Sequence, residues 1–186
     1  MGKRTEKTIY LGSGSPYIME YSGKMPTREE ICKPENLLGK TKSGAAVTYT
    51  TSTQVESDDL GSEKKIIFTA EDATLKLGII AFNGKTLANL VDRCKVEEEN
   101  GIRTVYIGGA GNAQGKEWVV CFHHPDKKDG DCWVMIRGNN TAGLALNYAV
   151  DSGAKLEPEF AALPHDDNGT LITYIEEIDQ TAAPAT

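Results

Sequence analysis

The sequence predicts a mainly β protein, an antiparallel β-sandwich or barrel with one short α-helix. Many short runs of β-branched and aromatic residues are separated by Gly, Asn and Asp turns, which is typical of such folds. Only one stretch has helical spacing.

The 186 residues fit one domain. The longest apolar run covers only residues 77–82, far short of the roughly 18 residues that span a bilayer.

The clearest strand is predicted at 46–55, AVTYTTSTQV. Val47, Tyr49 and Val55 alternate there with a second set of residues that is wholly polar, and β-branched side chains favour extended backbone. Both faces are rather polar for a strand. Further strands are expected at 65–70, 74–82, 103–107, 117–122, 132–137, 144–150, 155–163 and 171–175.

Two antiparallel hairpins are expected from neighbouring strands. In the first, Trp118, Val120 and Phe122 share a face with Val134 and Ile136, and the connection 123–131 contains Pro125 and Asp129-Gly130 as turn formers. In the second, EFAALP leads through HDDNG into TLITYI, where Asn168-Gly169 supplies the positive φ angles of a tight turn.

A single helix is predicted after Asn83-Gly84. Leu87, Leu90, Val91 and Cys94 follow the spacing of one apolar helix face, and Asn83 or Thr86 can cap the first turn. The like charges and glycine of 97–101 end it.

The remaining segments have little periodicity. Residues 28–31 are expected to form one turn of helix. The chain divides into an N-terminal arm at 1–15, a β domain at 16–178 and a C-terminal tail at 179–186, whose residues DQTAAPAT include no side chain large enough to dock.

One cluster could bind a metal. Cys121 and His123 are two residues apart on a predicted strand, His124 follows, and Cys132 lies across the expected hairpin, so zinc-type ligands could converge there. The spacing matches no standard zinc finger or ribbon. Buried thiols beside a histidine pair are the alternative, and we expect no metal and no cofactor.

Other motifs of catalysis are incomplete. The glycine-rich stretch 108–116 lacks the residues of a dinucleotide fingerprint or P-loop, and a strand rather than a helix follows it, so we expect a turn between strands. The carboxylate pairs mostly fall at predicted turns, and no serine lies in a nucleophile elbow. The protein is therefore not expected to be an enzyme.

Two stretches resemble bacteriophage major tail tube proteins. The first is TSTQVESDDLGSEKKIIFTAEDATLKLGIIAFN at 51–83 with the helix KTLANLVDRC at 85–94; the second is LEPEFAALP at 156–164 with the DDNG turn. The resemblance implies a tail-tube-like β domain with one flanking helix. It also implies hexameric rings whose sheets join into an inner β-barrel, and rings that stack into a conduit for DNA.

By the same resemblance, the polar stretch 40–62 is the candidate inter-ring loop, and both terminal segments are arms. Partners would be further copies of the chain and other tail proteins such as the tape measure, terminator and tail tip components. The location would be the virion tail, after synthesis in the host bacterial cytoplasm. The candidate subunit-interface residues are Thr48, Thr50, Ser52, Gln54, Asp58 and Asp59.

The charge pattern fits a self-assembling conduit. The net charge is −7, and it runs from a basic start to an acidic end. Opposite charges on two faces favour head-to-tail contacts, and acidic groups keep DNA phosphates from adhering. Two alternatives stay open: the inner tube of a contractile or secretion-type apparatus, and a carbohydrate-binding β-sandwich that uses Trp118 and Trp133 as stacking platforms.

Overall fold

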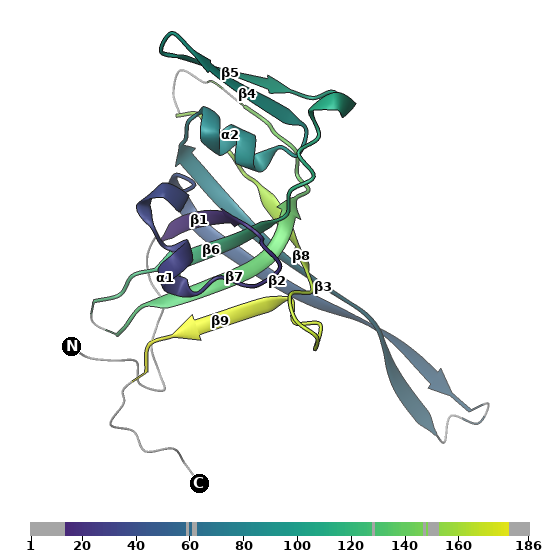
Figure 1. Cartoon of the computed structure of the whole chain (residues 1–186). Coiled ribbons are helices and arrows are strands. Elements are labelled where there is room, and N and C mark those ends of the chain that lie inside the picture. The colour runs from purple at the N-terminus through teal and green to yellow at the C-terminus, as the bar shows by residue number, and fades with distance from the viewer. Residues whose placement is uncertain are drawn as a thin grey trace.

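A computed structural model describes residues 14–58, 60, 63–127, 129–146, 148 and 153–178. The fold is mainly β and antiparallel, as the sequence predicted, with one large sheet in the strand order β1-β6-β7-β8-β3-β2 and a separate β4–β5 pair (Figure 1). The helices are α1 (Arg28–Ile31) and α2 (Gly84–Leu90). The strands are β1 (Ser15–Glu20), β2 (Lys40–Ser57), β3 (Lys64–Ala81), β4 (Cys94–Glu99), β5 (Ile102–Ile107), β6 (Trp118–His124), β7 (Cys132–Asn140), β8 (Glu159–Leu163) and β9 (Ile172–Glu176).

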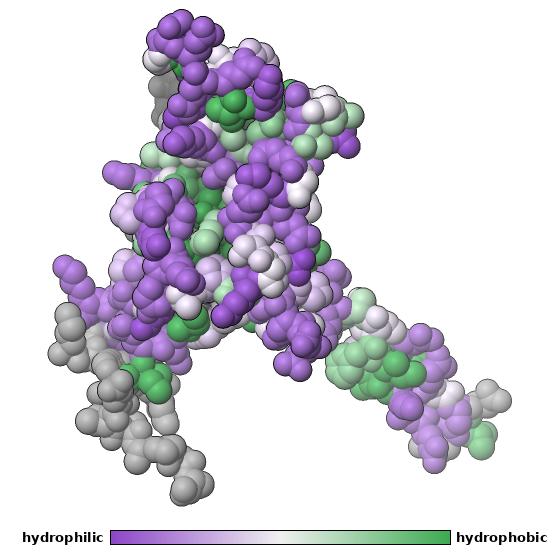
Figure 2. All heavy atoms as spheres, viewed as in Figure 1, coloured by the Kyte–Doolittle hydropathy of each residue, from purple (hydrophilic) through white to green (hydrophobic). Residues whose placement is uncertain are grey.

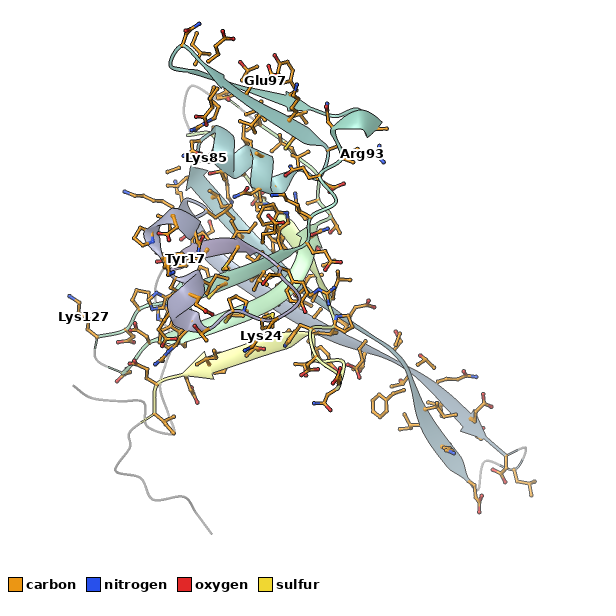
Figure 3. The ribbon with its side chains drawn as sticks, in the orientation of Figure 1. Tyr17, Lys24, Lys85, Arg93, Glu97 and Lys127 are labelled. Carbon is orange, nitrogen blue, oxygen red and sulfur yellow. The ribbon has the colours of Figure 1, made fainter. Side chains whose placement is uncertain are left out.

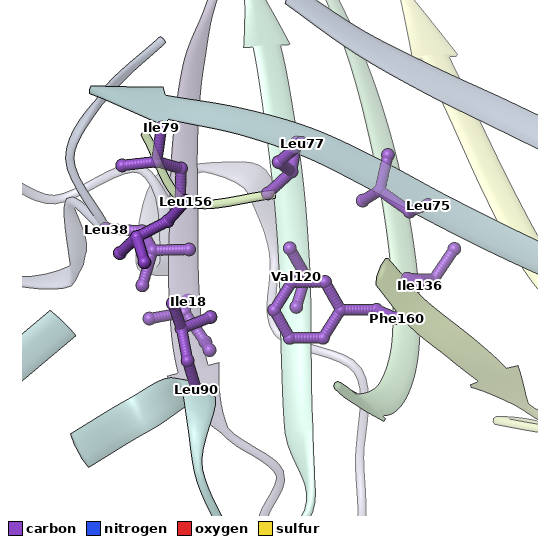
Figure 4. Close-up of a cluster of buried hydrophobic side chains, with 10 residues drawn as sticks. All are labelled: Ile18, Leu38, Leu75, Leu77, Ile79, Leu90, Val120, Ile136, Leu156 and Phe160. Atoms are coloured by element: carbon purple, nitrogen blue, oxygen red, sulfur yellow. The ribbon is translucent and has the colours of Figure 1, made fainter. Parts of the chain in front are cut away.

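The main core fills the concave face of the large sheet. It combines side chains from β1, β3, β6, β7 and β8, and α2 adds Leu90 (Figure 4). Phe160, Leu75 and Ile136 are fully buried there. A second cluster lies on the opposite face of β6 and β7, where α1 covers it with Ile31. The middle strands are therefore buried on both faces.

The first expected hairpin is confirmed. β6 and β7 pair with Val120 opposite Ile136 and Phe122 opposite Val134. The second is wrong, because β8 and β9 do not pair with each other. Both run along the same edge of β7, β8 beside Arg137–Asn140 and β9 beside Cys132–Ile136. The turn itself forms, with Gly169 at φ 78° and the Asp166 side chain accepting from the Thr170 amide. After the turn, β9 runs in the same direction as β8, because β7 is long enough to pair with both strands, one after the other.

The helix is shorter than expected. Asn83 caps it, since its side chain accepts from the Lys85 and Thr86 amides, and Thr86 donates to the Leu38 carbonyl. The helix ends at Leu90 rather than running through Cys94, which begins β4. The like charges of Glu97–Glu99, which in the sequence predict a helix end, lie instead in an exposed strand, where they stay in solvent.

Several strand boundaries also differ. The expected strands at 65–70 and 74–82 are one strand, β3, and 40–57 of the expected loop is strand β2. The short strand β1 was not predicted. The described residues of 144–150 form no strand, and of 155–163 only Glu159–Leu163 is one. The four-residue helix at 28–31 is confirmed, with a capping box between Thr27 and Glu30.

The two leucines Leu75 and Leu60 offer a matched test of this packing. Leu75 is 0% exposed in the core and Leu60 is 91% exposed. We expect Leu75→Ala to lower the free energy of unfolding by about 2–5 kcal/mol, because it removes buried methyl groups and leaves a cavity. Leu60→Ala should change it by less than about 0.5 kcal/mol. Urea unfolding followed by circular dichroism measures both, and equal effects would contradict the described core.

Candidate functional site

The largest unusual feature is a two-stranded arm that projects from the β domain. We call the distal part of the β2–β3 hairpin, residues 46–58 and 63–73, the arm (Figure 1). β2 and β3 are 18 residues each, and they pair continuously from Ala45 opposite Leu77 to Ser57 opposite Lys64, apart from one register shift. The Asp58 amide donates to the Glu63 carbonyl where the turn begins. Isolated hairpins are marginal in water, so the arm depends on its anchoring in the core.

One β-bulge sets which residues share a face of the arm. Ser52 pairs with Ala70, but Thr53 pairs with Phe68, so Thr69 is an extra residue in β3. Thr69 donates from its hydroxyl to the Ser52 carbonyl at 3.1 Å. A shift of one residue moves the following side chains to the other face. The bulge therefore places Phe68 and Ile66 on the face of Tyr49 and Val55.

This face carries an exposed apolar strip, made of Val47, Tyr49, Val55, Ile66 and Phe68. These side chains are 41% to 71% exposed. Figure 2 shows a hydrophobic patch on the arm, with mostly hydrophilic surface beyond it toward the tip. The same face of β3 continues into the main core through Leu75 and Leu77. The strip is thus an extension of the core face beyond the part that the domain covers, and such surfaces mark sites of association.

The opposite face of the arm is polar and contains the predicted interface residues. Thr48, Thr50, Ser52 and Gln54 alternate with the strip and are exposed. Asp58 lies at the turn, where its carboxylate accepts from the Glu63 amide at 2.9 Å, and Asp59 lies outside the described residues. The structure brings the four alternating residues onto one face. The pattern of β2 alone predicts Val47, Tyr49 and Val55 on the other face, but it does not predict that Ile66 and Phe68 join them.

The outer edge of β2 is the second feature of the arm. β2 ends the strand order, and β3 pairs with β8 only at Thr74–Lys76, so within the described chain the arm's edges have no strand partner. No charged residue or proline occurs at 43–55. Natural edge strands normally carry such residues to prevent pairing with another chain. The edge of β2 is thus open to strand addition.

One polar contact modifies the apolar strip. Glu71 pairs with Thr51, two residues along β2 from Tyr49, so the side chains of Glu71 and Tyr49 share a face. Partial desolvation, and then the Glu71 carboxylate, raise the pKa of the Tyr49 hydroxyl. The Tyr49 hydroxyl is thus a hydrogen-bond donor on a face that also carries Thr51, Thr53 and Glu71. Figure 3 shows that the arm carries its side chains clear of the body of the domain.

The four residues of the possible metal cluster do not converge. Cys121 and His123 lie on the face of the second core cluster, opposite Met135 and Trp133. His124 pairs with Cys132, and neighbouring residues of a strand point to opposite faces, so these two lie on the other side of the sheet. Among the described residues, no group of three or more His, Cys, Asp or Glu is placed to hold a metal ion.

His123 has structural partners instead. Its ring stacks on Trp133 with a centroid separation of 4.9 Å, and its Nε2 lies 2.8 Å from an oxygen of Asp131. Trp133 is buried, with the guanidinium of Arg28 also 4.8 Å from its ring. Trp118 is half-buried against the main core. Neither tryptophan forms the open platform that a carbohydrate-binding site requires.

The glycine-rich stretch joins β5 to β6, as expected for a turn between strands. Asn112 donates from its side chain to the Gly108 carbonyl at 2.7 Å. Gln114 donates from its side chain to the carbonyls of Ala88 and Val91 at the end of α2. These bonds hold the loop against α2. The stretch thus has a structural role in the fold.

The turn carboxylates are likewise used by the backbone. Asp126 accepts from the Asp129 amide, and Asp131 accepts from the Asp126 amide. Asp166 accepts from the hydroxyl and from the amide of Thr170, and the bond from the hydroxyl is the main reason that the pKa of Asp166 is lowered. Carboxylates occupied in this way close turns rather than form an acid–base pair.

Comparison with known protein families and with characterised proteins found no match for this chain. In the described part of the chain, no helix is long and apolar enough to cross a membrane.

The arm, with its apolar strip, polar face and open edge, is the candidate functional site on the strength of its geometry.

A matched pair of substitutions tests the two faces. Phe68 belongs to the apolar strip and Ile67, its chain neighbour, pairs with Gln54 on the polar face. We expect Phe68→Thr to reduce the fluorescence of a hydrophobic dye bound to the protein more than Ile67→Thr does, because only Phe68 continues the strip. Both should leave the free energy of unfolding within about 0.5 kcal/mol, because both side chains are exposed. An equal loss of fluorescence would contradict the assignment of faces.

Proposed function

We propose that the protein is the structural subunit of a bacteriophage tail tube, which assembles with copies of itself into stacked hexameric rings that conduct DNA. The observation that carries the proposal is the arm, whose apolar strip and uncharged strand edge are exposed in the single chain. Two such features on one hairpin favour addition to another β-sheet. A second copy always supplies such a sheet.

The size of the strip favours cooperative assembly over a stable pair. Its five side chains are about half exposed, and fully burying a large apolar side chain contributes about 1.5–3 kcal/mol, so covering the strip contributes roughly 4–8 kcal/mol. Association costs about 4–15 kcal/mol in lost translational and rotational freedom. Covering one strip therefore stabilises a pair of subunits only marginally. Backbone hydrogen bonds along the β2 edge and ring closure supply the remainder, so assembly depends on concentration and on an initiating surface.

The polar face suits the lining of a conduit. Thr48, Thr50, Ser52 and Gln54 are neutral hydrogen-bonding side chains, and β2 has no Lys or Arg between Lys42 and Ser57. Binding to DNA phosphates requires cationic groups that replace condensed counterions. If the four residues line the lumen, DNA passes without adhering. The open backbone edge of the same strand then forms the subunit interface, so these residues contribute their backbone groups to it while their side chains face the lumen.

The proposal includes the other tail components as partners and the virion tail as location, after synthesis in the bacterial cytoplasm. It includes no cofactor and no catalysis. The inner tube of a contractile or secretion-type apparatus uses the same self-assembly. A sheath-protein gene beside the gene for this chain would favour that version.

Lysine substitutions on the two faces of β2 test the proposal. We expect Tyr49→Lys combined with Val55→Lys to abolish rings and tubes, because two charges then lie on the apolar strip and oppose its burial. Thr48→Lys combined with Ser52→Lys places the same charges on the polar face and should still allow assembly. Negative-stain electron microscopy of concentrated protein, with sedimentation velocity, measures both outcomes.

Two results would overturn the proposal. One is a wild-type protein that remains a strict monomer at high concentration in the presence of tail-initiating proteins. The other is loss of assembly in the polar-face variant with retention in the strip variant. Circular dichroism confirms that each variant is folded, since all four positions are exposed.

A further inference from the structure

Two of the four cysteines lie together in the second core cluster, far from the arm. Cys121 is fully buried in the middle of β6, and Cys32 packs against the same cluster from the residue after α1. The two cysteines thus belong to one packed cluster, and each is the first cause of the shift in the other's pKa. Cys32 is half-buried, so solvent and small molecules reach its side of the pair.

The segments on either side of Cys32 hold it beside the second core cluster. α1 begins with a capping box in which the Thr27 amide donates to Glu30 at 2.7 Å. Ile31 is fully buried in the cluster, and the side-chain amide of Asn36 donates to the carbonyls of Glu30 and Ile31. Cys32 itself pairs with no strand, so its backbone can adjust without breaking a sheet. Cys121, in contrast, is held between β1 and β7.

The surroundings make the two thiols unequal. The pKa of Cys32 is lowered, first by the hydrogen bond from Cys121. The Trp133 indole and the Arg28 guanidinium act in the same direction. The pKa of Cys121 is raised, first by its hydrogen bond to Cys32 and then by burial. Cys32 thus loses its proton first, and the thiolate is the nucleophile in thiol–disulfide exchange.

We propose that Cys32 and Cys121 form a dithiol oxidation site, which reacts with low-molecular-weight disulfides and closes reversibly into an intramolecular disulfide. Cys32 is the attacking thiol and Cys121 the resolving thiol. The inference rests on this side of the domain alone and does not depend on the proposed function.

The exchange balances in two steps. The Cys32 thiolate attacks one sulfur of glutathione disulfide, which forms a mixed disulfide on Cys32 and releases one glutathione thiolate. The charge and hydrogen bond that raised the pKa of Cys121 are then gone. Cys121 then attacks the Cys32 sulfur, and its proton passes to the second glutathione as that thiolate leaves. Two protein thiols are oxidised by two electrons, and glutathione disulfide is reduced to two glutathione molecules.

The product joins α1 to β6. The disulfide would close a long loop between residues 32 and 121, and such loops restrict the unfolded chain most in the chain-entropy description. It would fix the α1 segment over the second core cluster without changing the arm. We therefore expect oxidation to raise the thermal midpoint of unfolding while leaving the overall β content unchanged.

The experiment uses the full-length chain and glutathione disulfide. Wild-type protein is incubated with the reagent under native conditions, and intact mass spectrometry follows the products. We expect the mass to fall by two hydrogen atoms, and a nonreducing peptide map to link the peptides of Cys32 and Cys121. Dithiothreitol should restore the original mass and the lower thermal midpoint.

Single substitutions separate the two roles. Cys121→Ser should stop at the mixed disulfide, seen as one added glutathionyl group on Cys32. Cys32→Ser should lower the initial rate of glutathione release about tenfold or more, because the remaining thiols are buried. Cys94→Ser and Cys132→Ser are the matched controls and should retain the wild-type reaction, since Cys132 faces the other side of the sheet and Cys94 bonds to Ala88.

The proposal depends on the wild-type result and not on the folding of any variant. A native protein that keeps its mass, while the same chain reacts after denaturation, would overturn it. So would a disulfide that maps to Cys94 or Cys132. A rate that rises with pH up to the pKa of Cys32 would support attack by its thiolate.

Discussion

The structure depends on the alternation of side chains along one strand, β3. Its inward residues, Leu75, Leu77 and Ile79, fill the concave core, and the same face continues past the edge of the domain as the apolar strip. Because the alternation has period two, any slip would exchange the core face with the solvent face. The bulge at Thr69 is compatible with this constraint only because it lies beyond the core, where it re-aims Phe68 and Ile66 without disturbing Leu75.

The two core clusters lie on opposite faces of the central strands, β6 and β7. β6 and β7 are buried on both sides, by the curled sheet on one face and by α1 on the other. This explains why their residues form near-continuous apolar runs instead of a clean alternation. It also explains why Cys121 and His124, close in sequence, have different surroundings: one belongs to the α1 side and the other to the side of the main core.

The sequence predicted what depends on local pattern. The strand at 46–55, the β6–β7 register and the Asn83 cap all follow from alternation or capping chemistry. The length of β3 did not, because Glu71 and Asp72 are typical of a turn, and only their exposure on the arm makes them acceptable within a strand. The collinear β8 and β9 were also missed, since the turn at Gly169 is a true turn and only the length of β7 decides what it connects. The alternation in β2 was enough to predict the polar candidate residues. The full apolar strip could not be predicted, because the bulge at Thr69, which aligns Phe68 and Ile66 with Tyr49, depends on the pairing of β2 with β3.

A protein that exposes such a strip must still avoid indiscriminate association. Charges lie within the strip and at its end: Glu71 pairs with Thr51 between Tyr49 and Val55, and Glu56, Lys64 and Lys65 lie beyond Val55 toward the turn. Desolvating these groups is costly unless a partner pairs with them. The strip therefore favours a partner whose apolar surface is narrow and whose flanks carry complementary charge. A repeated copy of one chain can present that surface in the same register at every contact, which makes the open edge selective as well as adhesive.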